Sequence, residues 1–586
     1  MRVMWILFAI LLAHTSRTSA SAATDPQPAA QADGSWTWTV SDASCQVLPP
    51  RCAVDGAVAE LHPAKTDIGQ TWIVRTQTRV IGTLNQTVKL ETVAGRTYLQ
   101  RRLHFTPGPE LNTDVRFELP VAWNGTSKLQ LPKRDGRVTV EASPAHYILG
   151  HNVADIVGRE LAMPLVAWLS DSGKQALVVA GDPYGGSDFR LDGKPTQLLQ
   201  GFWWRAGRGG SRDEDRLQSI SWGDATIPNT LAAWAGAVPD IAAAPPWVHS
   251  IALLYYDYFS DKGNGWFADI DALAEKIPAD KRGHALLCVH GWFDQMGSWS
   301  YDPATQAMRK TWTAMPAGDR VPMSVAEVHR RIDYARERGF RVALYAATAL
   351  LCDDKAPTWN PDLALRDKAG KMQSSYWKGP DTLGTNQRLD PTHPEVVAFY
   401  RAYQKALLTE FGPKLSALVY DETFYVTQGR FSWRDGKPAE ADRAMMRLVG
   451  QLSRDAESMR KSCKEIVVLT SDCVGFADHV AGGPIPPYSL ASHGTWQDSH
   501  SNPAAWPMAL LPNARNALWS CNWNPIKNKD WNRINHEKWR LPQSLSNGWG
   551  DKLGPAKMPK ELLEQVITRF NERCTDQRDR IRWLEQ

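Results

Sequence analysis

Short apolar runs alternate with helical segments through the second half of the chain, and this alternation restricts the possible folds more than any other feature. Eight runs are candidate strands, the last two weaker than the rest: 251–256, 285–290, 341–346, 415–420, 466–470, 489–492, 516–521 and 541–545. Helical segments fit between several of them: 270–277, 324–338, 394–410 and 438–461. Eight βα-like steps predict an α/β fold, a (β/α)8 TIM barrel, over residues 247–586. A doubly wound sheet would have a similar pattern, but no run is followed by the glycine-rich turn of a nucleotide-binding fold.

The first half of the chain has a different pattern. Short segments with period-two alternation, rich in Val, Thr and aromatic residues, are separated by Gly, Pro, Asn and Asp turns. This pattern predicts an antiparallel β-sandwich domain over residues 36–240. The stretch PDIAAAPP, 239–246, is then a linker to the barrel domain.

The amino end has the three parts of a secretory signal. Arg2 is followed by the apolar stretch 5–13 and by the small residues 20–22. A signal peptide over 1–22 and a linker over 23–35 are therefore predicted, with a membrane anchor as the alternative. No later run reaches the ~20 apolar residues of a membrane-spanning helix, so the mature protein is expected to be soluble and either secreted or periplasmic.

Charge and composition exclude some classes of partner. The formal net charge is only +4 and no basic block stands out, which argues against a nucleic-acid partner. The chain has 26 tryptophans, more than core packing needs, so some are expected to line a binding cleft.

Cys45 and Cys52 flank a Pro-Pro turn and are the best candidates for a disulfide. No C-x-x-C spacing indicates a zinc site.

Polar residues follow the predicted barrel strands at the ends where catalytic groups of such barrels lie. They are Asp257, His290, Trp292, Asp294, Asp353, Asp354, Asp421, Glu422, Asp472, His493, Trp496 and Asp498. A carboxylate pair suits glycoside cleavage, because one group attacks the anomeric carbon while the other protonates the leaving oxygen. Trp rings can cover a sugar face. Acidic groups could instead bind Ca²⁺ or Mg²⁺, but no H-x-H or H-E-x-x-H pair appears, so no metal or cofactor is predicted.

Two carboxylates are predicted to be catalytic. Asp421 directly ends an apolar strand, where a nucleophile would be held rigidly; otherwise it caps the loop or pairs with an arginine. Glu422 would alternate to the opposite face. Asp498 is the candidate general acid and would need a raised pKa; otherwise its turn is a solvated loop. Asp472 competes for that role.

Seven residues are predicted to bind substrate: Asp257, Trp292, Asp294, Trp377, Asp472, His493 and Trp496. The carboxylates among them could equally be ordinary loop residues. A single histidine after a strand is commonly structural, and most tryptophans pack in a core or a domain interface.

Two segments resemble the clan of retaining α-galactosidases and α-glucosidases. The sequence LDPTHPEV, 389–396, is similar to the segment before the fourth-strand nucleophile of that clan, and 359–361 with 367–371 resemble the loop after its third strand. The resemblance implies a sandwich followed by a barrel, with Asp421 as nucleophile and Asp498 as acid/base. The chain departs from the clan in having Val419 where a lysine is common, in the fifth-strand motif, and in lacking a C-terminal β-domain, because helical sequence runs nearly to its end.

These features together predict an exported glycoside hydrolase that cleaves α-linked sugars with retention through two Asp residues. The alternatives are a non-catalytic carbohydrate-binding protein and a transglycosidase on the same scaffold. The expected partner is a carbohydrate. The sugar, its linkage, endo or exo action and the oligomeric state are left open.

Overall fold

A computed structural model describes most of the chain. The described residues are 28–31, 35–40, 43–64, 70–93, 96–109, 111, 113–124, 128–133, 136–149, 159–161, 165–170, 172–181, 188–192, 197–204, 215–224, 243–259, 261–314, 320–375, 382–421, 430–436, 438–472, 492–498, 517–521, 543–547 and 553–575. The predicted signal peptide lies outside them. Within them, no helix has the length and apolar character needed to cross a membrane.

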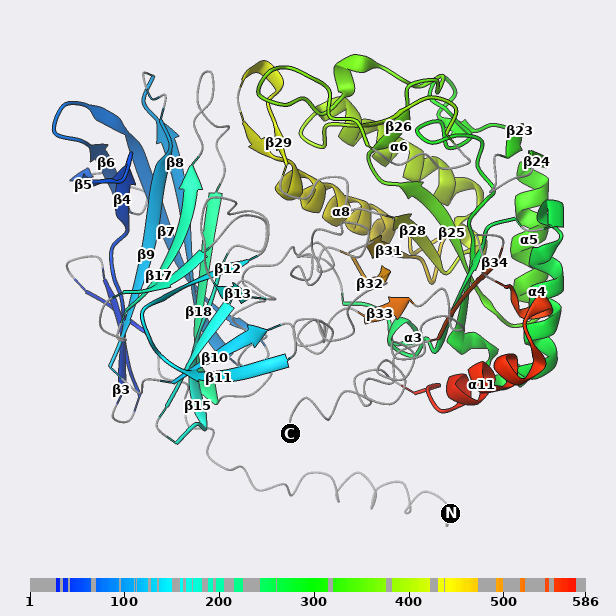
Figure 1. Ribbon diagram of the computed structural model, residues 1–586, viewed down its shortest axis with the longest axis horizontal. Helices are drawn as coiled ribbons and strands as arrows, with labels where there is room; N and C mark the ends of the chain where they lie inside the picture. The colour runs from blue at the N-terminus through cyan, green and yellow to red at the C-terminus, as the bar shows by residue number, and fades with distance from the viewer. Residues whose placement is uncertain are drawn as a thin grey trace, which may run out of the picture.

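Two sheets with antiparallel pairing make up the first half of the described chain, on the left of Figure 1. The first sheet contains β1 (Ala29–Ala30), β2 (Trp36–Val40), β3 (Ala43–Val47), β4 (Arg51–Val54), β9 (Val115–Trp123), β12 (Ala145–Leu149), β13 (Arg159–Leu161), β16 (Asp188–Leu191) and β17 (Gln197–Trp204). The second contains β6 (Gln70–Arg75), β7 (Val80–Val93), β8 (Arg96–Pro107), β10 (Lys128–Lys133), β11 (Gly136–Glu141), β14 (Leu165–Leu169), β15 (Gln175–Ala180) and β18 (Asp215–Asp224). Strand β5 (Ala57–Ala64) pairs with β4 in one sheet and β6 in the other. Among the described strands of this half, only β12 and β13 pair in parallel.

The two sheets pack against each other through two clusters of buried side chains. Trp38 and Val121 of the first sheet cluster with Leu99, Trp168 and Ile220 of the second. Side chains alternate along β9 between buried and partly exposed, as expected for a strand with one face on a core. This packing explains why the sequence alternates with period two, and it agrees with the antiparallel sheets expected there.

Eight parallel strands form the main sheet of the second half. They are β19 (Leu253–Asp257), β20 (Ala285–Val289), β25 (Arg341–Thr348), β28 (Ala417–Asp421), β31 (Val467–Asp472), β32 (Gly494–Asp498), β33 (Ala517–Cys521) and β34 (Gln543–Asn547). Each pairs with its neighbour in chain order from β19 to β33, and β34 pairs with β19, so the strand order returns to its start. Strands β33 and β34 also contact each other.

Helices and short elements connect these strands, with the described helices on the right of Figure 1 and near its centre. The α-helices are α3 (Pro246–His249), α4 (Gly265–Lys276), α5 (Val325–Glu337), α6 (Pro394–Glu410), α8 (Ala441–Ser458) and α11 (Lys560–Asn571). The 3₁₀ helices are η2 (Asp261–Gly263), η3 (Ala279–His284), η4 (Pro361–Leu363), η5 (Gly412–Lys414), η6 (Arg434–Gly436) and η11 (Pro555–Lys557). Short strand pairs are β21 (Tyr301–Asp302) with β22 (Ala307–Met308), β23 (Thr311–Ala314) with β24 (Val321–Ser324), β26 (Leu351–Asp353) with β27 (Asn386–Arg388), and β29 (Phe431–Ser432) with β30 (Ala439–Glu440).

The local sequence explains where α5 and α6 begin and end. The Ser324 hydroxyl accepts a hydrogen bond from the Glu327 amide and caps α5, and Gly339 follows that helix with φ +87°, which glycine adopts without strain. Pro394 occupies the first turn of α6, where its missing N–H costs nothing.

The sixth described strand is Gly494–Asp498, in which Gly494–Gln497 pairs with Leu469–Asp472, and most of the predicted run 489–492 lies outside the described residues. One sequence expectation needs correction. Cys45 and Cys52 are both unbridged. They lie opposite Trp123 and Phe117 of β9, six residues apart on that strand, which corresponds to about 20 Å. That separation is too long for a disulfide.

An ion-pair cluster joins the sandwich to the second half of the chain. Arg216 of β18 donates from both terminal nitrogens to Glu440 at 2.7 Å, and Arg443 of α8 donates to the same carboxylate at 3.2 Å. Burial raises the pKa of Glu440, but the two arginines outweigh it and lower the pKa from 4.5 to about 2.

We expect Glu440→Gln to lower the free energy of unfolding by about 3 kcal/mol at pH 7. Since the pKa of Glu440 is lower in the folded chain, the difference from wild type should be full above pH 4.5 and disappear as the pH falls toward 2. Denaturant unfolding at several pH values measures it. Glu564→Gln is the control, because Glu564 and Lys560 form an exposed pair that contributes little. A pH-independent loss would contradict the assignment.

Candidate active site

Asp421 is the last residue of β28 and is partly exposed. The Tyr345 hydroxyl of β25 lies 3.2 Å from its Oδ2 and donates to it, and the same hydroxyl is hydrogen-bonded to Thr348, the residue opposite Asp421 in the ladder. The Asp421 carbonyl accepts from the Ala349 amide at 2.9 Å. The carboxylate is thus held at the carboxyl end of a buried strand.

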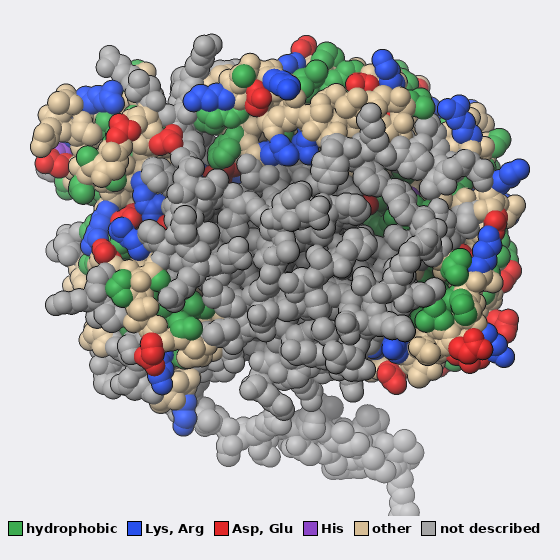
Figure 2. Space-filling model, viewed as in Figure 1, with side chains coloured by type: hydrophobic (Ala, Val, Ile, Leu, Met, Phe, Trp, Pro, Cys, Tyr) green, Lys and Arg blue, Asp and Glu red, His purple; other side chains and the backbone are tan. Residues whose placement is uncertain are grey.

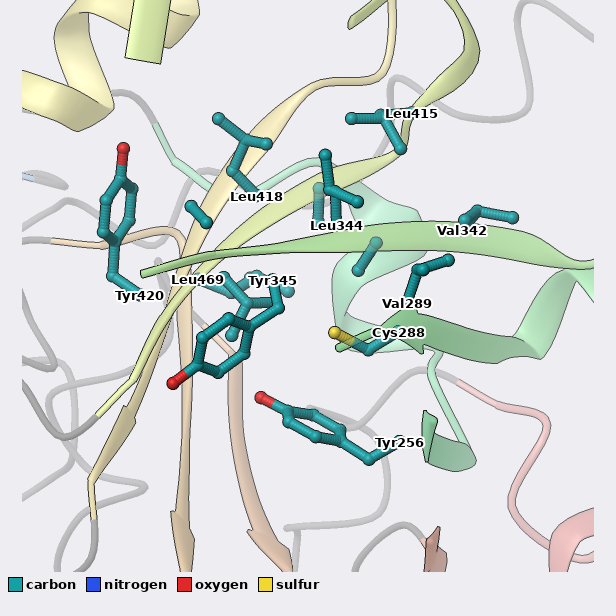
Figure 3. Close-up of a cluster of buried hydrophobic side chains, with 14 of the residues drawn as sticks. Tyr256, Cys288, Val289, Val342, Leu344, Tyr345, Leu415, Leu418, Tyr420 and Leu469 are labelled. Atoms are coloured by element: carbon teal, nitrogen blue, oxygen red, sulfur yellow. The ribbon is translucent and has the colours of Figure 1, made fainter. Parts of the chain in front are cut away.

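Figure 3 shows which side of the sheet carries this cluster. The Tyr256 and Tyr345 rings lie on one side with their hydroxyls pointing the same general way, whereas Tyr420 points away from them. The Tyr420 hydroxyl donates to Gln404 of α6 at 3.0 Å. Asp421 follows Tyr420 in β28, and neighbouring residues of a strand face opposite ways. Asp421 therefore faces the side of the sheet that carries Tyr345.

Aromatic rings surround His290 next to Asp421. The ring centroids of Tyr345, Tyr258 and Tyr256 lie 3.9, 4.3 and 5.5 Å from that of His290. Phe293 stacks on Tyr345 with centroids 5.6 Å apart and an interplanar angle of 18°. The carboxylate therefore sits beside a cluster of rings that carry polar groups.

The nearby phenol and thiol stay protonated at neutral pH. Burial raises the pKa of Tyr256 and of Cys288 well above their ordinary values, and the negative charge of Asp421 raises both further. These groups can therefore donate hydrogen bonds but do not act as bases there.

Two of the predicted substrate-binding carboxylates make contacts that hold loops. Asp257 is fully buried, accepts from the Phe259 amide at 3.1 Å and lies 3.5 Å from the Arg331 guanidinium. Asp294 accepts from the Ser300 amide at 2.7 Å and from Arg309 at 2.7 Å. Both stand at strand ends, as expected, but these contacts favour structural roles.

Trp292 and His493 are also buried. The Trp292 indole donates to the Tyr345 carbonyl at 2.8 Å, and the residue has no exposed surface. His493 precedes β32, accepts from the Val468 amide at 3.2 Å and contacts Glu457 at 2.9 Å. A sugar has no access to these rings in the described structure, so their contacts favour packing roles.

For the remaining predicted residues, the structure gives at most the position in a strand. Trp377 lies outside the described residues. Asp472 ends β31, Asp498 ends β32, and Trp496 lies in β32. Tyr420 of β28 pairs with Thr470 of β31, and Thr470 pairs with Thr495 of β32. Asp421 is therefore level with Trp496, and Asp498 lies two strands away and two residues closer to the carboxyl end. Two strands correspond to about 10 Å between backbones.

The segment 389–396 forms the turn into α6. Asp390 is buried and accepts from the Thr392 amide at 2.8 Å and from the Thr392 hydroxyl at 2.7 Å. Its other oxygen accepts from the Ser432 hydroxyl at 2.5 Å. Asp390 thus ties the chain before β28 to the chain after it.

Asp353 plays a similar part beyond β25. It is fully buried and accepts from Gln295 at 2.8 Å and from the Lys355 and Gly384 amides at 2.9 and 3.0 Å. The loops beyond the strands are therefore crosslinked by buried carboxylates. Among the described residues, no three His, Cys, Asp or Glu groups are placed to share a metal ion.

The sequence analysis missed Tyr345, Tyr256 and Tyr258. Tyr256 and Tyr345 are hydroxyl-bearing positions in largely apolar runs, and they face the same side as the predicted nucleophile. Strand alternation could have indicated them once the register was known.

Comparisons with known proteins give the fold but no family. No protein-family model and no curated protein matches the chain. A GH36 α-galactosidase variant from Geobacillus stearothermophilus, solved with raffinose, has a TM-score of 0.51 at 10% identity over 90% of this chain and 76% of its own. An α-galactosidase from Lactobacillus brevis has 0.51 at 11% over 95% and 69%. The α-N-acetylgalactosaminidase NagBb from Bifidobacterium bifidum, as a quadruple mutant, has 0.50 at 14% over 93% and 90%. The resemblance to the α-galactosidase clan is thus confirmed at the level of the fold.

We expect Asp390→Ala to lower the free energy of unfolding by about 1–3 kcal/mol, because a buried amide and two hydroxyls lose their acceptor. Hydrogen exchange at the 386–396 amides should increase at the same time. Asp302→Ala is the control, since Asp302 makes similar bonds to Ala304 and Thr305 in an exposed turn. Equal losses in the two variants would contradict the anchoring role.

Proposed function

We propose that the protein is an exported glycoside hydrolase that cleaves α-linked sugars with retention, using Asp421 as nucleophile and Asp498 as acid/base. The observation that carries the proposal is the position of Asp421 at the carboxyl end of a central parallel strand, oriented by the Tyr345 hydroxyl. This is where barrel enzymes hold their reacting groups. The return of the strand order from β34 to β19 supports a closed (β/α)8 barrel.

The proposed reaction has two displacements. In the first, a carboxylate oxygen of Asp421 bonds to the anomeric carbon while the glycosidic C–O bond breaks and Asp498 protonates the leaving oxygen. In the second, Asp498 takes a proton from water, which attacks the anomeric carbon and releases Asp421. Retention requires the two carboxyl groups to lie about 5–5.5 Å apart. Asp472 remains the competitor of Asp498.

The substrate class and the location are parts of the same proposal. The fold is shared with enzymes named as α-galactosidases, one of them solved with raffinose, and this favours an α-linked sugar. The signal-like stretch 1–22 supports secretion or export to the periplasm.

We expect Asp421→Asn to reduce turnover of aryl α-glycosides by about 10⁴-fold or more, because the covalent intermediate can no longer form. A panel of aryl α- and β-glycosides, with the product anomer followed by NMR, identifies the sugar and the stereochemistry. Asp362→Asn, at an exposed position in the 3₁₀ helix η4, should keep wild-type turnover. Inverted product would overturn the retaining mechanism. Sugar binding without turnover in the wild type would favour the carbohydrate-binding alternative.

We expect Tyr345→Phe to lower kcat by about 10–100-fold with little change in KM, since a hydrogen bond to a charged group contributes about 1.5–3 kcal/mol. Steady-state kinetics on the substrate found above measures this. Tyr420→Phe is a matched control, because it removes a buried hydroxyl bond on the opposite side of the sheet. Equal losses of kcat in both variants would show that Tyr345 only stabilises the fold.

A further inference from the structure

A separate pocket lies on the outer face of the first sheet of the sandwich. Its volume is about 490 Å³, and it lies over β4, β9 and β16 beside the β4–β5 hairpin. In Figure 1, β4 and β5 lie on the side of the sandwich away from the parallel sheet, so this pocket is distinct from the site at Asp421. Figure 2 shows charged and hydrophobic side chains together on this part of the sandwich. The volume is within the range of small-molecule sites.

Ion pairs fix the floor of the pocket. Arg116 donates to Asp188 at 2.8 Å and to Glu118 at 3.2 Å, and Arg190 donates to Glu118 at 3.1 Å. Asp188 is fully buried. A Cβ at position 201 would collide with the Arg116 guanidinium, so Gly201 is required for that side chain to lie against the sheet. The floor is therefore preorganised.

Three arginines line the pocket, and Asp188 beneath Arg116 and Asp192 beside Arg51 offset part of their charge. Arg51, Arg116 and Arg190 face one lining carboxylate, Glu118. Arg51 donates to the neutral Gln197 amide oxygen at 2.8 Å, and its nearest carboxylate, Asp192, is 3.9 Å away and half exposed. Asp192 also lies 4.0 Å from Arg190. The Arg51 side chain is 46% exposed, so it keeps room for a ligand.

An apolar wall faces these charges. Val58 lines the pocket and is 87% exposed, and Leu61 lies beside it. A ligand suited to both walls has an anionic group for the arginines, an apolar ring face for Val58, and hydroxyls that can donate to Glu118.

We propose that this pocket binds a sugar acid, with its carboxylate at Arg51 and Arg190 and its ring against Val58. Guanidinium groups recognise carboxylates with two parallel hydrogen bonds, which favours a carboxylate over a neutral group. The proposal does not depend on the reaction proposed for Asp421.

Titration calorimetry of the full chain with galacturonate, galactose and acetate tests it. Galacturonate should bind at millimolar concentration or below, at least 10-fold more tightly than galactose or acetate. Arg51→Ala and Val58→Asp should each weaken it at least 10-fold. Both sites are exposed enough for the variants to fold, which thermal unfolding verifies. Arg75→Ala, an exposed charge on β6, should leave the affinity unchanged.

Four outcomes would overturn the proposal. If galactose binds as tightly as galacturonate, the carboxylate does not contribute to binding. If acetate binds as tightly as galacturonate, the sugar ring does not contribute. Binding of galacturonate that survives Arg51→Ala and Val58→Asp would place the ligand elsewhere. Failure of all three compounds to bind would show that the pocket does not take a sugar acid.

Discussion

The parallel ladder of the second half is the constraint on which the rest of the site depends. Pairing in one direction brings the carboxyl ends of all eight strands to the same edge of the sheet. Asp421 and Tyr345 are 76 residues apart in sequence, yet register brings their side chains into hydrogen-bond contact. The buried strands hold this register, because a shift by one residue would turn Tyr345 and Asp421 to the other side. The positions of the side chains available for chemistry at this edge are thus set by the pairing of the parallel strands.

Carboxylates at this edge serve two purposes, and burial separates them. Asp257, Asp353 and Asp390 are almost fully buried and accept hydrogen bonds from backbone amides, whereas Asp421 is partly exposed and accepts from a tyrosine hydroxyl. A buried carboxylate must be fully bonded to remain charged, and such bonding makes it a good crosslink between loops. A reacting carboxylate needs access to substrate. An aspartate at this edge is therefore expected to be structural when it is buried and fully hydrogen-bonded, and catalytic when it is accessible.

Sequence reasoning was effective where the pattern is local. The period-two alternation predicted the antiparallel sheets, and the apolar runs predicted seven of the eight parallel strands within a few residues. The run 489–492 lies mostly outside the described residues, and the described sixth strand, Gly494–Asp498, is defined by its pairing with both neighbours. The Cys45–Cys52 hypothesis failed because proximity in sequence said nothing about the separate positions at which β3 and β4 pair with β9.

The sequence by itself determined the order of elements, the two kinds of sheet and the strand end that carries Asp421. These depend on periodicity and on turn residues, which act over a few positions. Only the tertiary structure decided which strand-end groups are anchors, that Trp292 and His493 are buried, and that Tyr345 orients Asp421. It alone brought Arg51, Arg116 and Arg190 around one pocket. Contacts of this kind join residues that are distant in sequence, and they depend on register and burial, which no short stretch of sequence encodes.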